Sequence, residues 1–145
     1  MLLLNPNYVH TITLYSCLKA KDSADKKEKW VRTVLRNCFC KAEMAEIQNG
    51  VEASKTNSYT VRIPQSAQYR PYHLWKGLVI GGTDGVFTVS EGDIVVLGEC
   101  TDEITGTAPN TAVELLHRHK PNAFRVSAFA DNTSHRMGKH YRLGG

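Results

Sequence analysis

The chain has 145 residues, a length that suits one domain burying about 68–70% of its unfolded-chain surface and leaves no room for a second. Apolar residues make up 41% and charged residues 22%, a composition that excludes disordered and collagen-like proteins. Lys and Arg number 9 against 6 Asp and Glu over residues 1–60, 3 against 7 over 61–114 and 6 against 1 over 115–145, for a net charge of +4. Opposite charges on different faces favour head-to-tail contact between copies at least as well as nucleic-acid binding.

The N-terminal third predicts a β-hairpin. Residues 8–18 are rich in Thr, Tyr, Ile and Leu and predict a long strand, and residues 30–41 predict its partner. Between them, residues 19–29 carry five Lys and three acidic residues, which is typical of a solvated hairpin tip.

Residues 42–57 are ambiguous. A helical turn over 43–47 competes with a second hairpin at Asn49-Gly50, the strongest short hairpin signal in the chain, and we favour the hairpin. Residues 58–64 alternate cleanly and predict a half-buried strand that Pro64 ends. The apolar face of that strand consists of Tyr59, Val61 and Ile63.

Residues 65–85 contain Gly77 and a Gly-rich cluster at 81–85 but no clear period. We expect a long internal loop, which tends to be functional in a compact domain. Residues 86–89 and 93–98 then predict two short strands. The second is apolar on both faces at 94–97, so we expect it at the centre of the sheet, in the core.

One short helix is expected near residues 111–119. Thr111 and Glu114 have the spacing of a capping box, and Leu115 and Leu116 provide the apolar stripe that anchors the helix to the core. Residues 124–130 and 140–143 predict two closing strands. The sequence therefore predicts a single mostly-β domain over residues 1–145, a small β-barrel or sandwich of about six to eight strands.

Possible metal and catalytic groups do not combine into a recognised site. His117 and His119 are two apart on the expected helix and diverge around its axis, while Cys38 and Cys40 lack the second ligand pair of a zinc finger. The chain also lacks a nucleophile elbow, a P-loop, a dinucleotide fingerprint and a HExxH pair. We expect no enzyme, no cofactor, no metal and no small-molecule substrate.

The cysteines and the hydropathy pattern indicate the compartment. Four Cys are too few for a disulfide scaffold, and those in apolar runs behave as small hydrophobes when reduced. The short apolar run at residues 1–4 lacks the features of a signal peptide, and no run approaches the about 18–20 residues of a membrane span. We expect synthesis in a reducing cytoplasm and no membrane partner.

A small β-barrel that binds nucleic acid is the alternative function. Basic residues lie near aromatic ones in two places, an arrangement used to grip single strands. These are Arg70 beside Tyr69 and Tyr72, and Arg136, Lys139 and Arg142 around Tyr141. The acidic middle of the chain would have to face away from the phosphates.

Several motifs recur in a recognisable order. Trp75 follows a loop containing Tyr and Pro; an aromatic-Thr-apolar strand comes next, and then Gly92-Asp93 with three apolar residues and Gly98. Upstream stands YTVRIP at 59–64, and downstream KPNAF at 120–124 and the terminal KHYRLGG. In this order and spacing, residues 58–145 resemble a minor capsid protein family of prophages and tailed phages of Gram-positive bacteria.

That resemblance implies a structural virion protein of the head-tail junction, similar to head-completion and stopper-like connector proteins. Its expected partners are copies of itself in a ring, the portal or adaptor, and tail proteins. The isolated chain is expected to be monomeric or only weakly associated, and to form a ring on a portal-side template. We expect Tyr69, Tyr72 and Trp75 to carry the contact, with Arg70, Arg136, Lys139 and Arg142 facing Glu99, Asp102 and Glu103 of a neighbour.

Overall fold

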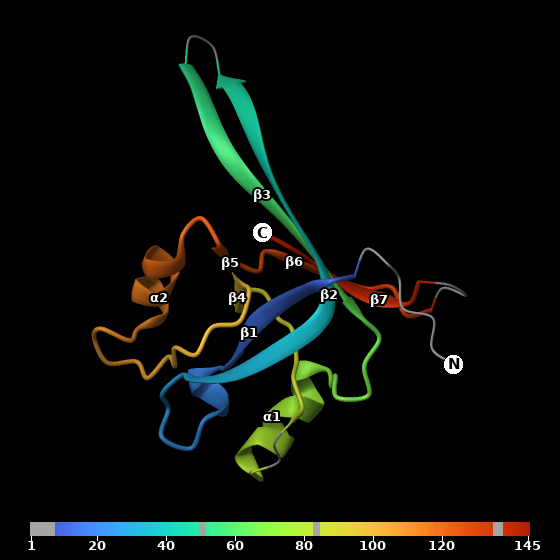
Figure 1. Ribbon diagram of the computed structural model, residues 1–145. Coiled ribbons are helices and arrows are strands. Elements are labelled where there is room, and N and C mark those ends of the chain that lie inside the picture. Colours follow the sequence, from blue (N-terminus) through green and yellow to red (C-terminus); the bar gives the residue numbers. More distant parts are fainter. Residues whose placement is uncertain (1–7, 50–51, 83–84, 135–137) are drawn as a thin grey trace.

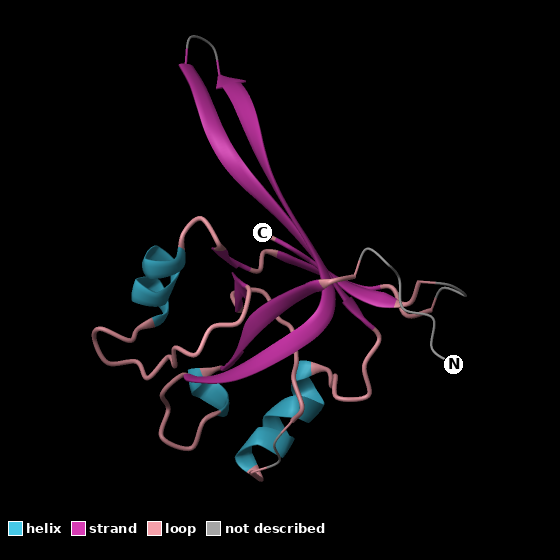
Figure 2. Ribbon diagram, in the orientation of Figure 1, coloured by secondary structure: helices cyan, strands magenta, loops and turns pink. Residues whose placement is uncertain are grey.

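A computed structural model describes residues 8–49, 52–82, 85–134 and 138–145. It confirms the mostly-β fold: seven antiparallel strands form one sheet that curls into a half-barrel, in the order β5-β4-β1-β2-β3-β7-β6 (Figures 1 and 2). The strands are β1 His10–Leu18, β2 Lys29–Asn49, β3 Glu52–Pro64, β4 Ile94–Leu97, β5 Ala123–Arg125, β6 Ala128–Asp131 and β7 His140–Gly144. The helices are α1 Tyr72–Ile80 and α2 Ala112–His119, with a 3₁₀ turn at Ala20–Asp22. Among the described residues, no helix is long and apolar enough to cross a membrane.

The strand β2 belongs to both halves of the curled sheet. Its first part pairs with β1 as far as Cys38, and from Phe39 onward it pairs with β3. Near this change of partner the β1–β2 register shifts, and Asn37 has a φ of 58°. Asn tolerates this left-handed conformation better than most residues, and such irregularities bend a strand. Because of this bend, one long strand can pair with β1 in one half of the curled sheet and with β3 in the other.

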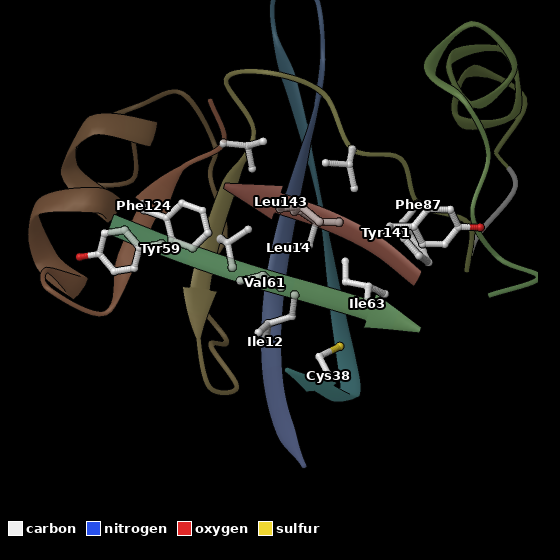
Figure 3. Close-up of a cluster of buried hydrophobic side chains, with 13 residues drawn as sticks. Ile12, Leu14, Cys38, Tyr59, Val61, Ile63, Phe87, Phe124, Tyr141 and Leu143 are labelled. Carbon is white, nitrogen blue, oxygen red and sulfur yellow. The ribbon is translucent and has the colours of Figure 1, made fainter. Parts of the chain in front are cut away.

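The main core lies inside the curl. Inward residues of β1 and β3 meet there, including Ile12, Leu14, Val61 and Ile63, none more than 2% exposed (Figure 3). The period-2 pattern of residues 58–64 is thereby confirmed, because Tyr59 is also buried in this cluster. Aromatic rings from β5 and β7, those of Phe124 and Tyr141, close it.

A second core lies on the opposite face of β1 and β4. Ile94 and Val96 pack there with Tyr15 and Leu115, while Val95 points into the main core. The strand β4 is thus buried on both faces, as its apolar run predicted. Its expected place at the centre of the sheet is wrong, because β4 is the second strand from the edge and is covered on its outer face by α2. The expected helix is confirmed as α2, where the Glu114 N–H donates to Thr111 Oγ1 at 3.3 Å.

Three further local predictions are wrong. The expected loop 65–85 contains α1, whose Gly77 is tolerated inside the helix and whose end falls at Gly81 and Gly82. Residues 86–89 form no strand: Phe87 makes only an isolated bridge with Tyr69. The expected strand 124–130 is divided into β5, which pairs with β4, and β6, which pairs with β7. Between β5 and β6 the chain crosses from one half of the sheet to the other. The alternation of apolar and polar residues does not reveal such a change of pairing partner.

Candidate functional site

The most conspicuous surface feature is a projecting arm, which we define as residues 43–49 and 52–58, the distal parts of β2 and β3 (Figure 1). Its strands pair with each other from Glu43↔Ser58 to Asn49↔Glu52. In the described part of the chain, neither β1 nor β7 extends its ladder to the arm. Seven residues on each strand, separated by six steps of about 3.3 Å, make the arm about 20 Å long. The hairpin predicted at Asn49-Gly50 is confirmed by this pairing, although Gly50 lies outside the described residues.

The helix α1 carries two of the residues expected to contact a neighbour, and the structure separates their roles. Trp75 is fully buried, so its indole offers no surface to a partner in this conformation. Tyr72 is half-buried and donates its hydroxyl to Asp22 Oδ2 at 2.6 Å; burial, with that bond, raises the pKa of Tyr72 to about 12. The apolar side chains that α1 does expose are Leu74 and Ile80, at 53% and 60%.

The tip between β1 and β2 is only partly the solvated loop that was expected. Residues 24–29 are exposed, but the Lys19 backbone N–H donates to the Tyr72 hydroxyl and Lys76 forms an ion pair with Asp22 at 3.5 Å. The start of the tip therefore holds α1 against the body.

Tyr69 and Arg70 lie at the mouth of the main core. The Tyr69 ring packs against Tyr141 at a centroid distance of 4.3 Å and against Phe129 at 6.0 Å. The Arg70 guanidinium donates to backbone carbonyls of Ala67 and Tyr69. Both side chains are half-buried, so they stabilise the 65–71 connection and leave one side accessible.

The acidic segment expected to meet a neighbour is engaged within the chain. Three Arg–carboxylate pairs account for it: Arg36 with Glu99 at 3.2 Å, Arg32 with Glu103 at 3.2 Å and Arg118 with Asp102 at 2.9 Å. These pairs reduce the negative charge that this segment can offer to another subunit.

The basic end of the chain lies on the outer face of the sheet. Arg142 and Lys139 are exposed, and Arg142 pairs in register with Arg62 of β3. The Arg62 guanidinium lies over the Phe39 ring, 5.3 Å from its centroid. Arg136 lies outside the described residues. The outer face of β2, β3 and β7 therefore combines positive charge with an aromatic ring.

A cluster that sequence reasoning missed lies beside the second core. Cys100 Sγ lies 3.5 Å from His119 Nε2, and Asp102 Oδ2 lies 2.8 Å from the same nitrogen. The Tyr15 hydroxyl is 3.2 Å from Cys100 Sγ and donates to the Asp102 carbonyl at 2.6 Å. The hydrogen bonds from His119 and Arg118 hold the pKa of Asp102 below its usual range.

The spacing of residues explains why this cluster was missed. The spacing of His117 and His119 shows that these two side chains diverge on α2, but it does not reveal other partners of His119. The missing information was that the Cys100-x-Asp102 stretch returns to the end of α2, and only the path of residues 98–111 supplies it. The Cys-x-Asp pair followed by a His at a helix end was the available signal.

A buried carboxylate occupies the Gly92-Asp93 motif. Asp93 is 1% exposed and accepts N–H bonds from Cys17 at 3.1 Å and Ser90 at 2.8 Å. Burial raises its pKa to about 7, because these two donors only partly replace the lost water. Gly92 has a φ of 92°, which an L side chain rarely adopts. The motif therefore builds the turn that leads into β4.

These features define a mostly-β half-barrel with a projecting arm, an exposed apolar helix and a Cys-Asp-His cluster. The chain belongs to DUF6751, a family of unknown function whose model matches residues 8–145. Comparisons with curated proteins and with solved structures found no match.

Proposed function

We propose that the chain is a structural virion protein of the phage head-tail junction, a connector or stopper-like minor capsid subunit that acts through protein–protein contacts in a ring. The motif order of residues 58–145 supports this proposal through its resemblance to minor capsid proteins of prophages and tailed phages. Its partners are copies of itself, the portal or adaptor, and tail proteins. The subunit is made in the bacterial cytoplasm and acts in the virion, without catalysis.

The arm is the observation that carries the proposal. A two-stranded hairpin alone in water is marginally stable, and no other described strand pairs with either outer edge of the arm, so those edges offer backbone groups to a partner. Such an arm gains stability when it lies against a second protein, either by adding to a sheet or by covering a groove. In a ring, every subunit meets a neighbour at a fixed position, so one arm per subunit links the whole assembly.

Charge supports a particular direction of contact. The arm contains Glu43, Glu46 and Glu52 against the single Lys55, a formal charge of −2. The outer face of β2, β3 and β7 offers Arg62 and Arg142, and the exposed Lys139 directly precedes β7. We therefore assign the arm, in place of the paired segment 99–103, as the acidic partner of a neighbour's basic face. Opposite charges on distinct surfaces suit a head-to-tail interface that closes into a ring.

The helix α1 supplies an apolar contact. Leu74 and Ile80 are exposed, and Lys76, the only charged residue of the helix, is paired with Asp22. Exposed apolar surface marks many protein contacts, and we assign Leu74 and Ile80 as the side chains of α1 that a neighbour covers. The expected role of segment 65–85 is thus kept, with Leu74 and Ile80 in place of Trp75.

A shortened arm tests the proposal. Removing residues 44–47 and 54–57 together deletes four ladder pairs, an even number that leaves the facing of the remaining residues unchanged. Light scattering is measured on the protein alone and with a purified phage portal assembly. We expect a monomer alone, a ring on the portal for the native chain, and no ring for the shortened chain. A native chain that never associates with the portal would refute the proposal.

The contribution of α1 is tested in the same assay. The Leu74→Ser/Ile80→Ser double variant should weaken ring formation, while Val113→Ser is the matched control, because Val113 is equally exposed at 54% but lies on α2. Equal loss in both variants would mean that general surface hydrophobicity, and not α1, drives association.

Nucleic-acid binding is the second candidate, favoured by Arg62 stacked on Phe39 beside Arg142. Its test is fluorescence anisotropy with a labelled single-stranded oligonucleotide at two salt concentrations. Binding by this face should weaken steeply with salt and fall in Arg142→Ala, but not in the exposed control Lys27→Ala. Binding of this kind by a chain that ignores the portal would favour this function over the connector role.

A further inference from the structure

Three potential metal-ligand atoms converge where the loop after β4 meets the end of α2. One ligand atom each from Cys100, Asp102 and His119 lies within 4.8 Å of the other two. Cys100 is 5% exposed, while the side chains of Asp102 and His119 are about one-third and one-quarter exposed, at 34% and 27%. The cluster is thus closed on the side of the core and open on the other.

We infer that Cys100, Asp102 and His119 form a binding site for one divalent transition-metal ion, best suited to Zn²⁺, with a fourth position open to water or to a ligand from a partner. A thiolate, an imidazole and a carboxylate are all common zinc ligands. The thiolate disfavours Mg²⁺ and Ca²⁺, which prefer all-oxygen sites. This inference does not depend on the role at the head-tail junction.

The distances fit such an ion with a small adjustment. Zinc bonds of about 2.3 Å to sulfur and about 2.05 Å to nitrogen place the two ligand atoms about 3.5 Å apart at a tetrahedral angle. Cys100 Sγ and His119 Nε2 are 3.5 Å apart. The Asp102 oxygen, 2.8 Å from Nε2, has to retreat by about 0.6 Å to reach its tetrahedral distance. Its side chain can move because it lies on a loop and is partly exposed.

The same geometry argues against a thiol nucleophile. In a nucleophile–His–acid triad, one ring nitrogen takes the proton of the nucleophile and the other is held by the acid. Here the thiol and the carboxylate face the same nitrogen, Nε2. One nitrogen of His119 cannot both take the proton of the thiol and be held by the carboxylate. A bound ion, in contrast, requires ligand atoms that converge on one point, as these three do.

The surroundings support a cation. His119 is the last residue of α2, and the carbonyl end of a helix favours positive charge. The Tyr15 hydroxyl contacts Cys100 Sγ and orients it. Outer groups of this kind fix metal ligands in many sites. The Arg118 guanidinium donates to Asp102 Oδ2 at 2.9 Å; its positive charge opposes the ion, so the ion has to compete with Arg118 for this carboxylate. A thiolate and a carboxylate together neutralise the charge of the ion.

Metal titration of the full chain tests the inference. The purified protein is treated with a chelator, dialysed, and titrated with Co²⁺ and then with Zn²⁺. We expect one Co²⁺ per chain, a thiolate-to-cobalt charge-transfer band, and displacement by Zn²⁺ but not by Mg²⁺. Zn²⁺ at about 100 times its dissociation constant should raise Tm by roughly 5–10 °C.

Variants identify the ligands. Cys100→Ala and His119→Gln should abolish the band, and Asp102→Asn, which preserves the size of the side chain, should weaken affinity by at least about tenfold. Cys17→Ala and His117→Gln are the matched controls and should bind as the native chain does. Circular dichroism confirms that each variant is folded.

Two results would overturn the inference. One is a native chain that binds no Co²⁺ and whose Tm does not respond to Zn²⁺. The other is a band that survives in Cys100→Ala or His119→Gln, because another set of residues would then hold the metal. If Cys100→Ala does not fold, Asp102→Asn and His119→Gln decide the question.

Discussion

The strand β3 has two parts with different surroundings. From Tyr59 to Pro64 it lies between β2 and β7, and its alternate side chains enter the main core. From residue 52 to 58 it pairs with β2 alone, in the arm. One continuous strand therefore passes from a fully supported environment to one with a single neighbour. The two parts also differ in sequence, because residues 59–63 are rich in strand-forming Tyr, Thr, Val and Ile, whereas residues 52–58 are mostly polar or small.

This contrast leads us to expect that the body carries stability and, under the proposed function, that the arm carries contact. Burial of an apolar side chain such as Val61 contributes roughly 1.5–3 kcal/mol, and the body contains many such residues. The arm is mostly polar or small in sequence, with Met44 and Ile47 as its large apolar residues. We expect changes in the body to alter folding and changes in the arm to alter assembly.

The largest expected effect is in the second core. Val96 is 4% exposed and packs with Tyr15 and Ile94 beneath α2. Val96→Asp places an unpaired carboxylate there, a cost of several kcal/mol that a domain of this size cannot absorb. We expect no soluble folded protein, as judged by expression and far-UV circular dichroism. A normal spectrum and Tm would mean that β4 is not buried on both faces.

The next effect depends on pH and belongs to Asp93. Its pKa is raised to about 7 from its ordinary value of 3.8, so the folded state retains a proton that the unfolded chain has released. Below about pH 4 the carboxyl group of Asp93 does not affect the free energy of unfolding. As the pH rises from about 4 to about 7 it lowers that free energy, and above about pH 7 the loss stays constant. The loss amounts to at most about 4 kcal/mol, since each pH unit corresponds to about 1.36 kcal/mol.

Asp93→Asn isolates this effect. The amide oxygen still accepts one N–H bond but carries no charge, so the stability of the variant relative to the native chain should rise between pH 4 and pH 7. Urea unfolding at several pH values measures the difference in the free energy of unfolding between the variant and the native chain. The contributions of the other carboxyl groups cancel in this difference because both proteins contain them. A constant difference across that range would contradict the raised pKa.

A smaller effect is expected at a buried hydroxyl. Ser16 is fully buried, and its hydroxyl donates to the Thr88 carbonyl at 2.7 Å, which attaches residues 86–89 to β1. Ser16→Ala leaves that carbonyl without its donor, at a cost of about 1–2 kcal/mol. Denaturant unfolding measures the loss, and Ser127→Ala, at an exposed serine on the surface, should cost less.

Much of the fold could be predicted from local pattern. Three features are determined by a few neighbouring residues each. They are the alternation of Tyr59, Val61 and Ile63, the capping box at Thr111 and the Asn49-Gly50 turn. The helix α1 was missed because Gly77 and the glycines after it suggested a loop, while the reason for the helix, Trp75 filling the space beneath the body, is a tertiary contact. The break between β5 and β6 is likewise set by which strand each one pairs with.

The candidate site was less predictable, for the same physical reason. Charge runs showed where acidic and basic residues occur but not whether they pair within the chain, as Glu99 does with Arg36. The cluster of Cys100 and His119 joins residues 19 positions apart through a loop without a periodic pattern. Burial of Trp75 removes it from the surface, although an amphipathic indole serves cores and interfaces equally well.

The smallest expected effect on stability is in the arm. In the chain lacking residues 44–47 and 54–57, the body keeps every described ladder between β3 and β7 and between β1 and β2. We therefore expect its free energy of unfolding to remain within about 1 kcal/mol of the native value, because a two-stranded hairpin contributes little stability by itself. Differential scanning calorimetry measures this directly.

Hydrogen exchange of the native chain sharpens the same prediction. Amides of residues 59–63 should exchange only by global unfolding, whereas those of the arm should exchange by local opening and become protected when the ring forms on the portal. Such a change confined to the arm would link its low stability to its contact with a neighbour. If the arm were as protected as β1 in the free subunit, it would be an independently stable element, and the argument that it requires a partner would fail.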